Sequence, residues 1–213
     1  GPSGAVVGVD PNPGMLAVAE ELNGAVEWQK GTAEELPFPD ASFDAVVSQF
    51  GLMFFSDPSA AAREMGRVLC PSGALAVAVW DALENSPAYA LEVELLDRLA
   101  GPAAADALRA PFALGDGDEL AALFEDAGLS SVEVLTGTGR ARFPSVRVMV
   151  EADLRGWLPV MGVELSDEKI EEILTEAEAV LAPFVTDAGR AEFDQPAHIV
   201  VGLRGAEGED GAT

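Results

Sequence analysis

Residues 31–55, GTAEELPFPDASFDAVVSQFGLMFF, form the stretch that decides the fold. Within it, residues 43–50 (FDAVVSQF) are a short apolar run entered from polar residues, which predicts a β-strand. The apolar residues are continuous, and this favours a strand covered on both faces, as in a parallel sheet flanked by helices. Ligands of such sheets bind beyond the carboxyl ends of the strands, so Gln49, Phe50 and Gly51 are expected at the edge of a small-molecule pocket. A buried strand followed by an ordinary loop is an equal alternative on this segment alone.

The preceding residues predict a strand, a turn and a helix. Residues 5–10 (AVVGVD) form an apolar run ending in a carboxylate, and residues 15–22 (MLAVAEEL) have helical composition and spacing. This order is half of a βαβ unit. The Asp10 carboxylate, at the end of its strand, could accept two hydrogen bonds from a ribose diol. Capping of the following helix, or acceptance of turn amides, is the alternative role for Asp10.

The next segments repeat the alternation of strands and helices. Residues 25–30 predict a strand, residues 57–69 a helix capped by Asp57, and residues 74–80 (ALAVAVW) a buried strand after a turn at residues 70–73. With the strand at residues 43–50, this order predicts an α/β doubly wound sheet with helices on both faces.

Beyond residue 85 the pattern becomes mainly helical. Helices are expected at residues 86–100, 118–127, 143–158 and 167–181, strands at 131–138 and 197–203, and a loop or irregular cover at 101–117. The last residues, 205–213, are small and acidic and are expected to be frayed.

Composition excludes several classes of function. The 213-residue chain carries 37 acidic and 12 basic residues, a net charge of −25, which disfavours nucleic acid and anionic membranes as partners. Cys70 is the only cysteine, so an internal disulfide and a cysteine-rich zinc site are excluded, and no metal site is expected. No stretch approaches the roughly 18 apolar residues of a membrane span, and no signal peptide pattern is present, so a cytoplasmic protein is expected.

Three segments in order carry a resemblance to a known family. VVGVDPNPGML (residues 6–16), GTAEELPFPDASFDAVVSQFGL (residues 31–52) and REMGRVLCPSGALAVAVWD (residues 63–81) resemble class I S-adenosylmethionine-dependent methyltransferases. The most similar branch contains the ubiquinone/menaquinone-biosynthesis C-methyltransferases. The resemblance is specific over residues 4–81 and weak beyond. It implies a Rossmann-like sheet with a mostly helical cap.

The resemblance also implies residues that bind S-adenosylmethionine: Asp10, Pro11, Met15, Thr32, Ala33 and Gln49. Asp10 matches the acidic residue that binds both ribose hydroxyls. Thr32 stands where the family often has Asp or Asn at the adenine edge, which makes the contact to the adenine amino group less certain. Gln49 matches the residue near the methionine part of the cofactor.

The resemblance implies a further strand and a glycine-rich loop before Ala5, which only four residues precede. A fragment of a longer chain, or a chain lacking the innermost strand and its loop, is therefore expected. Loss of a central strand exposes two sheet edges or forces its neighbours to pair directly. We predict weak or absent binding of S-adenosylmethionine by this chain alone. Calorimetric titration tests this, and tight stoichiometric binding would contradict it.

By this resemblance the domains are a partial cofactor-binding core at residues 1–85, a helical cap with sheet-completing strands at 86–204, and the acidic tail. The expected function is methyl transfer to a small-molecule acceptor. Apolar helices containing Trp157 and Met161 indicate a hydrophobic acceptor, with ordinary helix packing as the alternative. No catalytic residue is assigned, because His198, the only histidine, lies in an apolar strand-like run and is expected to be structural.

Two other classes of function are open. A non-catalytic binding or interaction protein derived from the same fold is favoured by the absent glycine-rich loop. A nicotinamide-dependent oxidoreductase also uses an acidic residue after its second strand, but the LPFPDxSFDxVVxxFGL pattern argues against it.

Overall fold

The computed structural model describes residues 4–205, so all but the first residue of the predicted acidic tail lies outside the described residues. The strands are β1 (Val7–Asp10), β2 (Glu27–Lys30), β3 (Phe43–Gln49), β4 (Leu69–Trp80), β5 (Leu129–Phe143) and β6 (Ala191–Arg204). The α-helices are α1 (Pro13–Leu22), α2 (Pro58–Val68), α3 (Pro87–Ala100), α4 (Pro102–Arg109), α5 (Gly117–Asp126), α6 (Val146–Ala152), α7 (Leu158–Val160) and α8 (Asp167–Val180). Short 3₁₀ turns and one π-helical turn, η4 (Asp153–Trp157), connect them.

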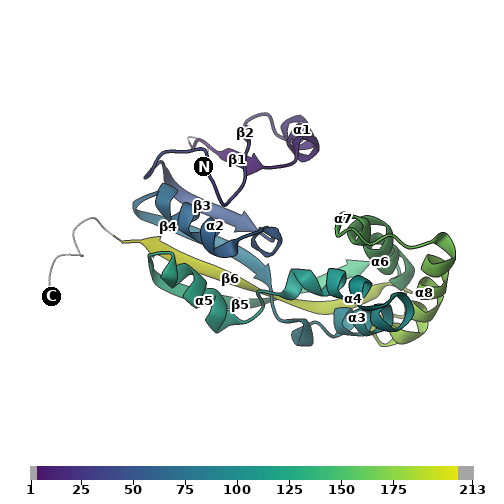
Figure 1. Ribbon diagram of the computed structural model, residues 1–213. Coiled ribbons are helices and arrows are strands. Elements are labelled where there is room, and N and C mark those ends of the chain that lie inside the picture. Colours follow the sequence, from purple (N-terminus) through teal and green to yellow (C-terminus); the bar gives the residue numbers. More distant parts are fainter. Residues whose placement is uncertain (1–3, 206–213) are drawn as a thin grey trace. The chain divides into compact units, whose positions relative to one another are not determined.

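The strands form two separate sheets (Figure 1). Strands β1 and β2 pair in parallel, with Val7 opposite Glu27 and Asp10 opposite Lys30. The second sheet has the order β3-β4-β6-β5. In the described part of the chain β1 therefore pairs only with β2, and β3 only with β4. The α/β class is confirmed, and β1 and β3 each have one edge without a pairing strand within residues 4–205.

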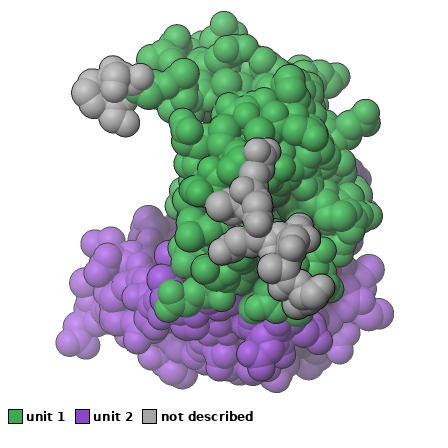
Figure 2. All heavy atoms as spheres, turned by 90° about the vertical axis from the view of Figure 1, so that its left-hand side faces the viewer, with its two compact units in different colours: residues 1–77, 121–133, 200–213 green, residues 78–120, 134–199 purple. Residues whose placement is uncertain are grey.

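The chain divides into two compact units (Figure 2). The first comprises residues 1–77, 121–133 and 200–213, and the second comprises residues 78–120 and 134–199. Each unit has its own buried side chains.

In the first unit, the N-terminal segment is thinly covered. None of residues 4–51 is fully buried, and Leu22 on α1 and Val47 on β3 are 82% and 77% exposed. The expectation that residues 43–50 form a strand covered on both faces is therefore wrong. The physical reason is that β3 is an edge strand with a pairing partner on one side only.

The core of the first unit is built on α2 and β4. Asp57 accepts a hydrogen bond from the Ala60 amide at 2.9 Å and Pro58 occupies the first turn, as the sequence predicts for this helix start. The helix buries its apolar face, and β4 buries alternate residues. The turn expected at residues 70–73 is instead part of a continuous strand, in which Ser72 has a positive φ of 65°.

The second unit is mainly helical, with a core formed by α3, α4, α6 and α8. The loop expected at residues 101–117 is wrong, because α4 and a 3₁₀ turn occupy most of it. Pro102 in the first turn suits a helix start, and alanine is the strongest helix former. The helix buries Ala104, Ala105 and Leu108 on one face, so small residues serve here as packing surface.

Among the described residues, the structure contains no helix with the length and apolar character needed to cross a membrane.

Candidate functional site

The carboxyl ends of β1 and β2 bring together the residues expected to bind the adenosine part of the cofactor. Asp10 and Lys30 are register partners at the last positions of the two strands. The Gly31 amide donates a hydrogen bond to the Asp10 carbonyl at 3.3 Å, so Thr32 begins directly beyond this edge. Two predicted site segments far apart in sequence therefore share one sheet edge.

Asp10 is half-buried and its side chain is partly engaged. One carboxylate oxygen, Oδ1, accepts a hydrogen bond from the Asn12 amide at 2.7 Å. Asn12 is the N-cap of α1, and its side-chain oxygen accepts from the Gly14 and Met15 amides at 2.8 and 3.3 Å. Of the alternative roles for Asp10, acceptance of a turn amide occurs, whereas helix capping falls to Asn12.

The remaining expected contacts lie on exposed surface or in the other sheet. Pro11 and Thr32 are exposed, Ala33 is half-buried, and Met15 is 58% exposed on the first turn of α1. Gln49 is exposed at the carboxyl end of β3, followed by Phe50 with a positive φ of 53°. No strand pairing joins β3 to β1 in the described part of the chain, so Gln49 does not share the edge that carries Asp10.

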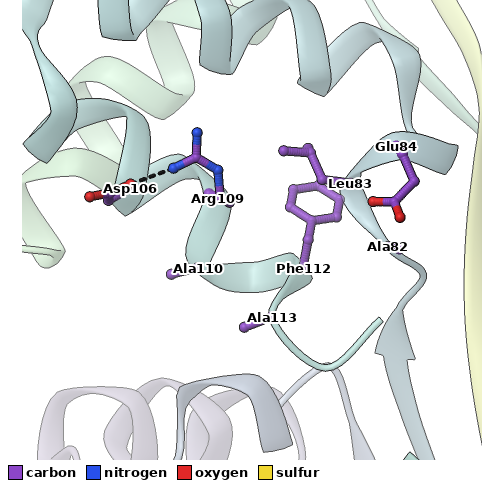
Figure 3. Close-up of a pocket in the computed structure, with 8 residues that line it drawn as sticks. All are labelled: Ala82, Leu83, Glu84, Asp106, Arg109, Ala110, Phe112 and Ala113. Carbon is purple, nitrogen blue, oxygen red and sulfur yellow. Dashed lines mark hydrogen bonds and ion pairs between the residues drawn. The ribbon is translucent and has the colours of Figure 1, made fainter. Parts of the chain in front are cut away.

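A pocket of about 320 Å³ lies in the second unit (Figure 3). It is lined by Ala82, Leu83, Glu84, Asp106, Arg109, Ala110, Phe112 and Ala113. Arg109 is ion-paired with Asp106, Glu84 adds a second carboxylate to the lining, and Leu83 and Phe112 are its large apolar side chains. Tyr89 packs against Phe112 and Phe193, with ring centroids 5.5 and 5.7 Å apart. Burial raises the pKa of Tyr89, as expected for a phenol packed in a core.

His198 is buried and held by three partners, all within the second unit. Its Nε2 lies 3.0 Å from the Gly115 carbonyl and 3.1 Å from Asp81 Oδ1, and its Nδ1 lies 2.9 Å from the Thr136 hydroxyl. Both partners of Nε2 are acceptors, so Nε2 carries a proton and donates to them. This arrangement agrees with the expected structural role.

Two electrostatically coupled carboxyl groups in the second unit, the buried Glu92 and the half-buried Asp153, were missed by the sequence analysis. Glu92 on α3 is fully buried, and neither side-chain oxygen has a hydrogen-bond partner within the described residues. Burial, and then the charge of Asp153, raise the pKa of Glu92 well above its usual value; burial raises the pKa of Asp153 to about 7. The signal was helical spacing, because Glu92 is one turn from the buried Ala88 and Leu96.

Side chains with metal-ligating atoms do not converge: no group of three or more His, Cys, Asp or Glu residues is placed to hold a metal ion across residues 4–205.

Comparison with known proteins assigns the N-terminal part of the chain. Residues 1–77 match the methyltransferase domain family. This match covers the first 77 of the 213 residues. Residues of this chain are 35% identical to a demethylmenaquinone methyltransferase of Staphylococcus carnosus over an aligned length of 153 residues, 65% of this chain and 63% of that protein. They are also 45% identical to the ubiquinone/menaquinone biosynthesis C-methyltransferase of Pasteurella multocida over 83 residues, 36% of this chain and 31% of that protein. The chain thus spans less than two thirds of these relatives.

Solved structures extend the likeness to the whole fold. The YcgJ protein of Bacillus subtilis covers 96% of this chain, and 83% of its own chain is covered, with a TM-score of 0.59 at 22% identity. A SAM-dependent methyltransferase of Thermotoga maritima covers 93% of this chain and 72% of its own, with a TM-score of 0.53 at 19% identity. At these identities the comparison establishes the fold alone, which is the Rossmann-like α/β fold of these solved structures.

Proposed function

We propose that the chain takes part in methyl transfer from S-adenosylmethionine to a small-molecule acceptor. The observation that carries the proposal is the shared carboxyl edge of β1 and β2, which presents Asp10 beside the segment containing Thr32 and Ala33. Ligands of Rossmann-like sheets bind at this edge. The bound sulfonium would supply an activated methyl group, so the protein contributes mainly alignment and exclusion of water.

Residues of the first unit suit the adenosine part of the cofactor. Asp10 has one carboxylate oxygen engaged by the Asn12 amide and is half-buried, so its charge is available to a ribose diol at the strand end. Pro11 and Met15 lie in the adjoining turn and first helical turn, and Thr32 and Ala33 would line the adenine edge. Gln49 would lie toward the methionine part. No base is assigned to the reaction.

The acceptor is proposed from the names of the relatives and from the second unit. The Staphylococcus carnosus relative is described as a demethylmenaquinone methyltransferase, which suggests an isoprenoid quinone precursor as a first acceptor to test. The pocket in the second unit is walled by Leu83 and Phe112, which suits a hydrophobic ring. A cytoplasmic location belongs to the same proposal.

The test is transfer of labelled methyl from S-adenosylmethionine to a panel of acceptors that includes demethylmenaquinone. Labelled product that depends on the protein supports the proposal. The absence of labelled product with every acceptor would contradict it.

Replacement of the ribose-binding carboxylate should weaken cofactor binding. Asp10→Asn keeps an oxygen that can accept from the Asn12 amide, but it removes the charge that would accept from the diol. We expect the dissociation constant of S-adenosylhomocysteine to rise by about 10- to 100-fold, since hydrogen bonds to charged groups contribute roughly 1.5–3 kcal/mol. Calorimetric titration measures it. Glu20→Gln, an exposed charge removal on α1, is the control and should leave the constant unchanged.

A non-catalytic binding protein is the second candidate function. The observation that favours it is the separation of β1 and β2 from the four-stranded sheet, which leaves the adenosine edge apart from Gln49. We expect such a protein to bind the cofactor without transferring a methyl group, or to bind neither cofactor nor acceptor.

A further inference from the structure

The guanidinium of Arg67, near the end of α2, has a partner for each of its five N–H donors. Nε and Nη2 donate to the two carboxylate oxygens of Glu64 at 2.6 and 2.7 Å. Nη2 also donates to the Leu36 carbonyl at 3.1 Å, and Nη1 donates to the Phe38 carbonyl at 2.8 Å and to Asp40 at 2.7 Å. One side chain thus contacts three alternate positions of residues 36–40, which lie about 30 positions earlier in the sequence.

Glu64 completes this attachment from the neighbouring turn of α2. Its Oε2 accepts a hydrogen bond from the Leu36 amide at 2.8 Å. The hydrogen bonds from Arg67 hold the pKa of Glu64 below its usual range, so the carboxylate stays charged. The side chains of Arg67 and Glu64 are only 29% and 20% exposed, which limits the competition from water for these contacts.

The N-terminal end of α2 also binds this segment, through Glu34. Glu34 accepts hydrogen bonds from the Ser56 and Asp57 amides at 2.8 and 3.4 Å, where the helix begins. Its own backbone amide and these two amides lower the pKa of Glu34. Both ends of α2 therefore bind residues 34–40, and this segment begins directly after Thr32 and Ala33.

We infer that Arg67 and Glu64 are positioning residues for the adenine-binding segment: by fixing residues 36–40 to α2 they fix the place of Thr32 and Ala33. The inference has a structural half, that Arg67 and Glu64 fix residues 32–40 in the free protein, and a functional half, that this placement favours adenine binding. Only the functional half rests on the proposed function. Lysine cannot substitute, because its single ammonium lacks the fork that reaches Glu64, two carbonyls and Asp40 at once.

Hydrogen exchange tests the structural half in the free protein. In Arg67→Met we expect the amides of Leu36 and of residues 32–35 to exchange about tenfold faster. The Ser42 amide donates to the Val68 carbonyl, a bond made without the Arg67 side chain, and should be unchanged. Equal acceleration of Ser42 would show general destabilisation, and unchanged exchange at residues 32–36 would show that Arg67 positions nothing; either result overturns the inference. Arg67→Lys is the second variant if Arg67→Met fails to fold, with the same expectation.

Ligand discrimination tests the functional half. Calorimetric titration with S-adenosylhomocysteine and with its inosine analogue measures the preference for the adenine amino group. We expect Arg67→Met to raise the dissociation constant of S-adenosylhomocysteine about tenfold, the effect of losing about one hydrogen bond. We also expect the variant to show a smaller preference for S-adenosylhomocysteine over its inosine analogue. A variant that weakens both ligands equally, or neither, contradicts the inference. Arg98→Met, which removes an exposed ion pair with Glu176, is the matched control and should alter nothing.

The two levels of failure are distinguishable. If the parent chain binds neither ligand, that result agrees with the weak or absent binding expected of this chain alone, and the exchange experiment decides whether Arg67 positions the segment. If the parent binds and the variant keeps its preference, the proposed function stands and the inference fails.

Discussion

Gly115→Ala is expected to lower the free energy of unfolding by about 3 kcal/mol or more, the upper range for overpacking a core. A Cβ at this position would lie 2.2 Å from the Ala82 amide nitrogen, 2.4 Å from Ala82 Cα and 2.6 Å from the Asp81 carbonyl carbon. These are backbone atoms, so no rotation of a side chain can relieve the clash. The two chain segments themselves would have to separate.

Separation of these segments would also break a buried polar network. The Gly115 carbonyl accepts from His198 Nε2 at 3.0 Å, and Asp81 accepts from the Ala82 amide at 2.7 Å and from Asn85 at 3.0 Å. A shift of either segment leaves a buried donor or acceptor without its partner, which adds a further cost of about 1–3 kcal/mol for each group. The variant therefore combines a steric and a polar penalty.

Urea unfolding followed by circular dichroism measures this effect. Gly137→Ala is the control, since no atom lies within 4 Å of its added Cβ. Because the clash is with the backbone of Ala82, the double variant with Ala82→Gly should show no rescue. A stability of Gly115→Ala equal to that of Gly137→Ala, or restoration by Ala82→Gly, would contradict the account.

The features that the sequence predicts well are those set by neighbouring residues. The start of α2 follows from Asp57 and Pro58, and the strand–turn–helix order around Asp10 needs only local patterns. The residues of the β1–β2 edge could be paired from sequence because parallel strands place their carboxyl ends together.

The features missed depend on distant parts of the chain. Whether β3 is covered depends on its neighbours in the sheet and not on its own apolar run. Helix α4 was hidden by a composition rich in Ala, Gly and Pro, although its alanines pack against other helices. The contacts of Arg67 reach residues about 30 positions away, so only the i,i+3 spacing to Glu64 was visible.

Glu92→Met is expected to stabilise the protein by about 1–3 kcal/mol at pH 7. Glu92 is fully buried and neither carboxyl oxygen has a hydrogen-bond partner within the described residues. Folding therefore removes the hydration of this carboxyl group without replacing it by hydrogen bonds, which destabilises the folded state by about 1–3 kcal/mol. Methionine has a similar length and is unbranched, and it can occupy the same space without a polar atom that needs hydrogen bonding. The increase in the free energy of unfolding comes from removing the desolvation cost of the Glu92 carboxyl group.

The pH dependence of stability should also change. The pKa of Glu92 is raised in the folded state, and that of Asp153 is raised from 3.8 to about 7. The folded state therefore holds protons that the unfolded chain has released, so stability is greatest below about pH 4 for these two groups and falls as the pH rises toward 7. Each proton contributes a slope of up to about 1.4 kcal/mol per pH unit. Glu92→Met removes one of the two protons and should flatten the slope, leaving the contribution of Asp153.

Urea unfolding at half-unit steps from pH 4.5 to 8 measures both effects in the parent and the variant. Glu94→Met, an exposed replacement on the same helix, is the control and should change stability by less than about 0.5 kcal/mol with the parent's pH slope intact. Were Glu92 charged and paired in solution, Glu92→Met would instead lose stability, and the loss would be nearly constant over this pH range, because a group stabilised in its ionised form titrates below its ordinary pKa. The sign of the change at pH 7 and the direction of the slope difference therefore decide together whether this carboxyl group is buried as a neutral acid.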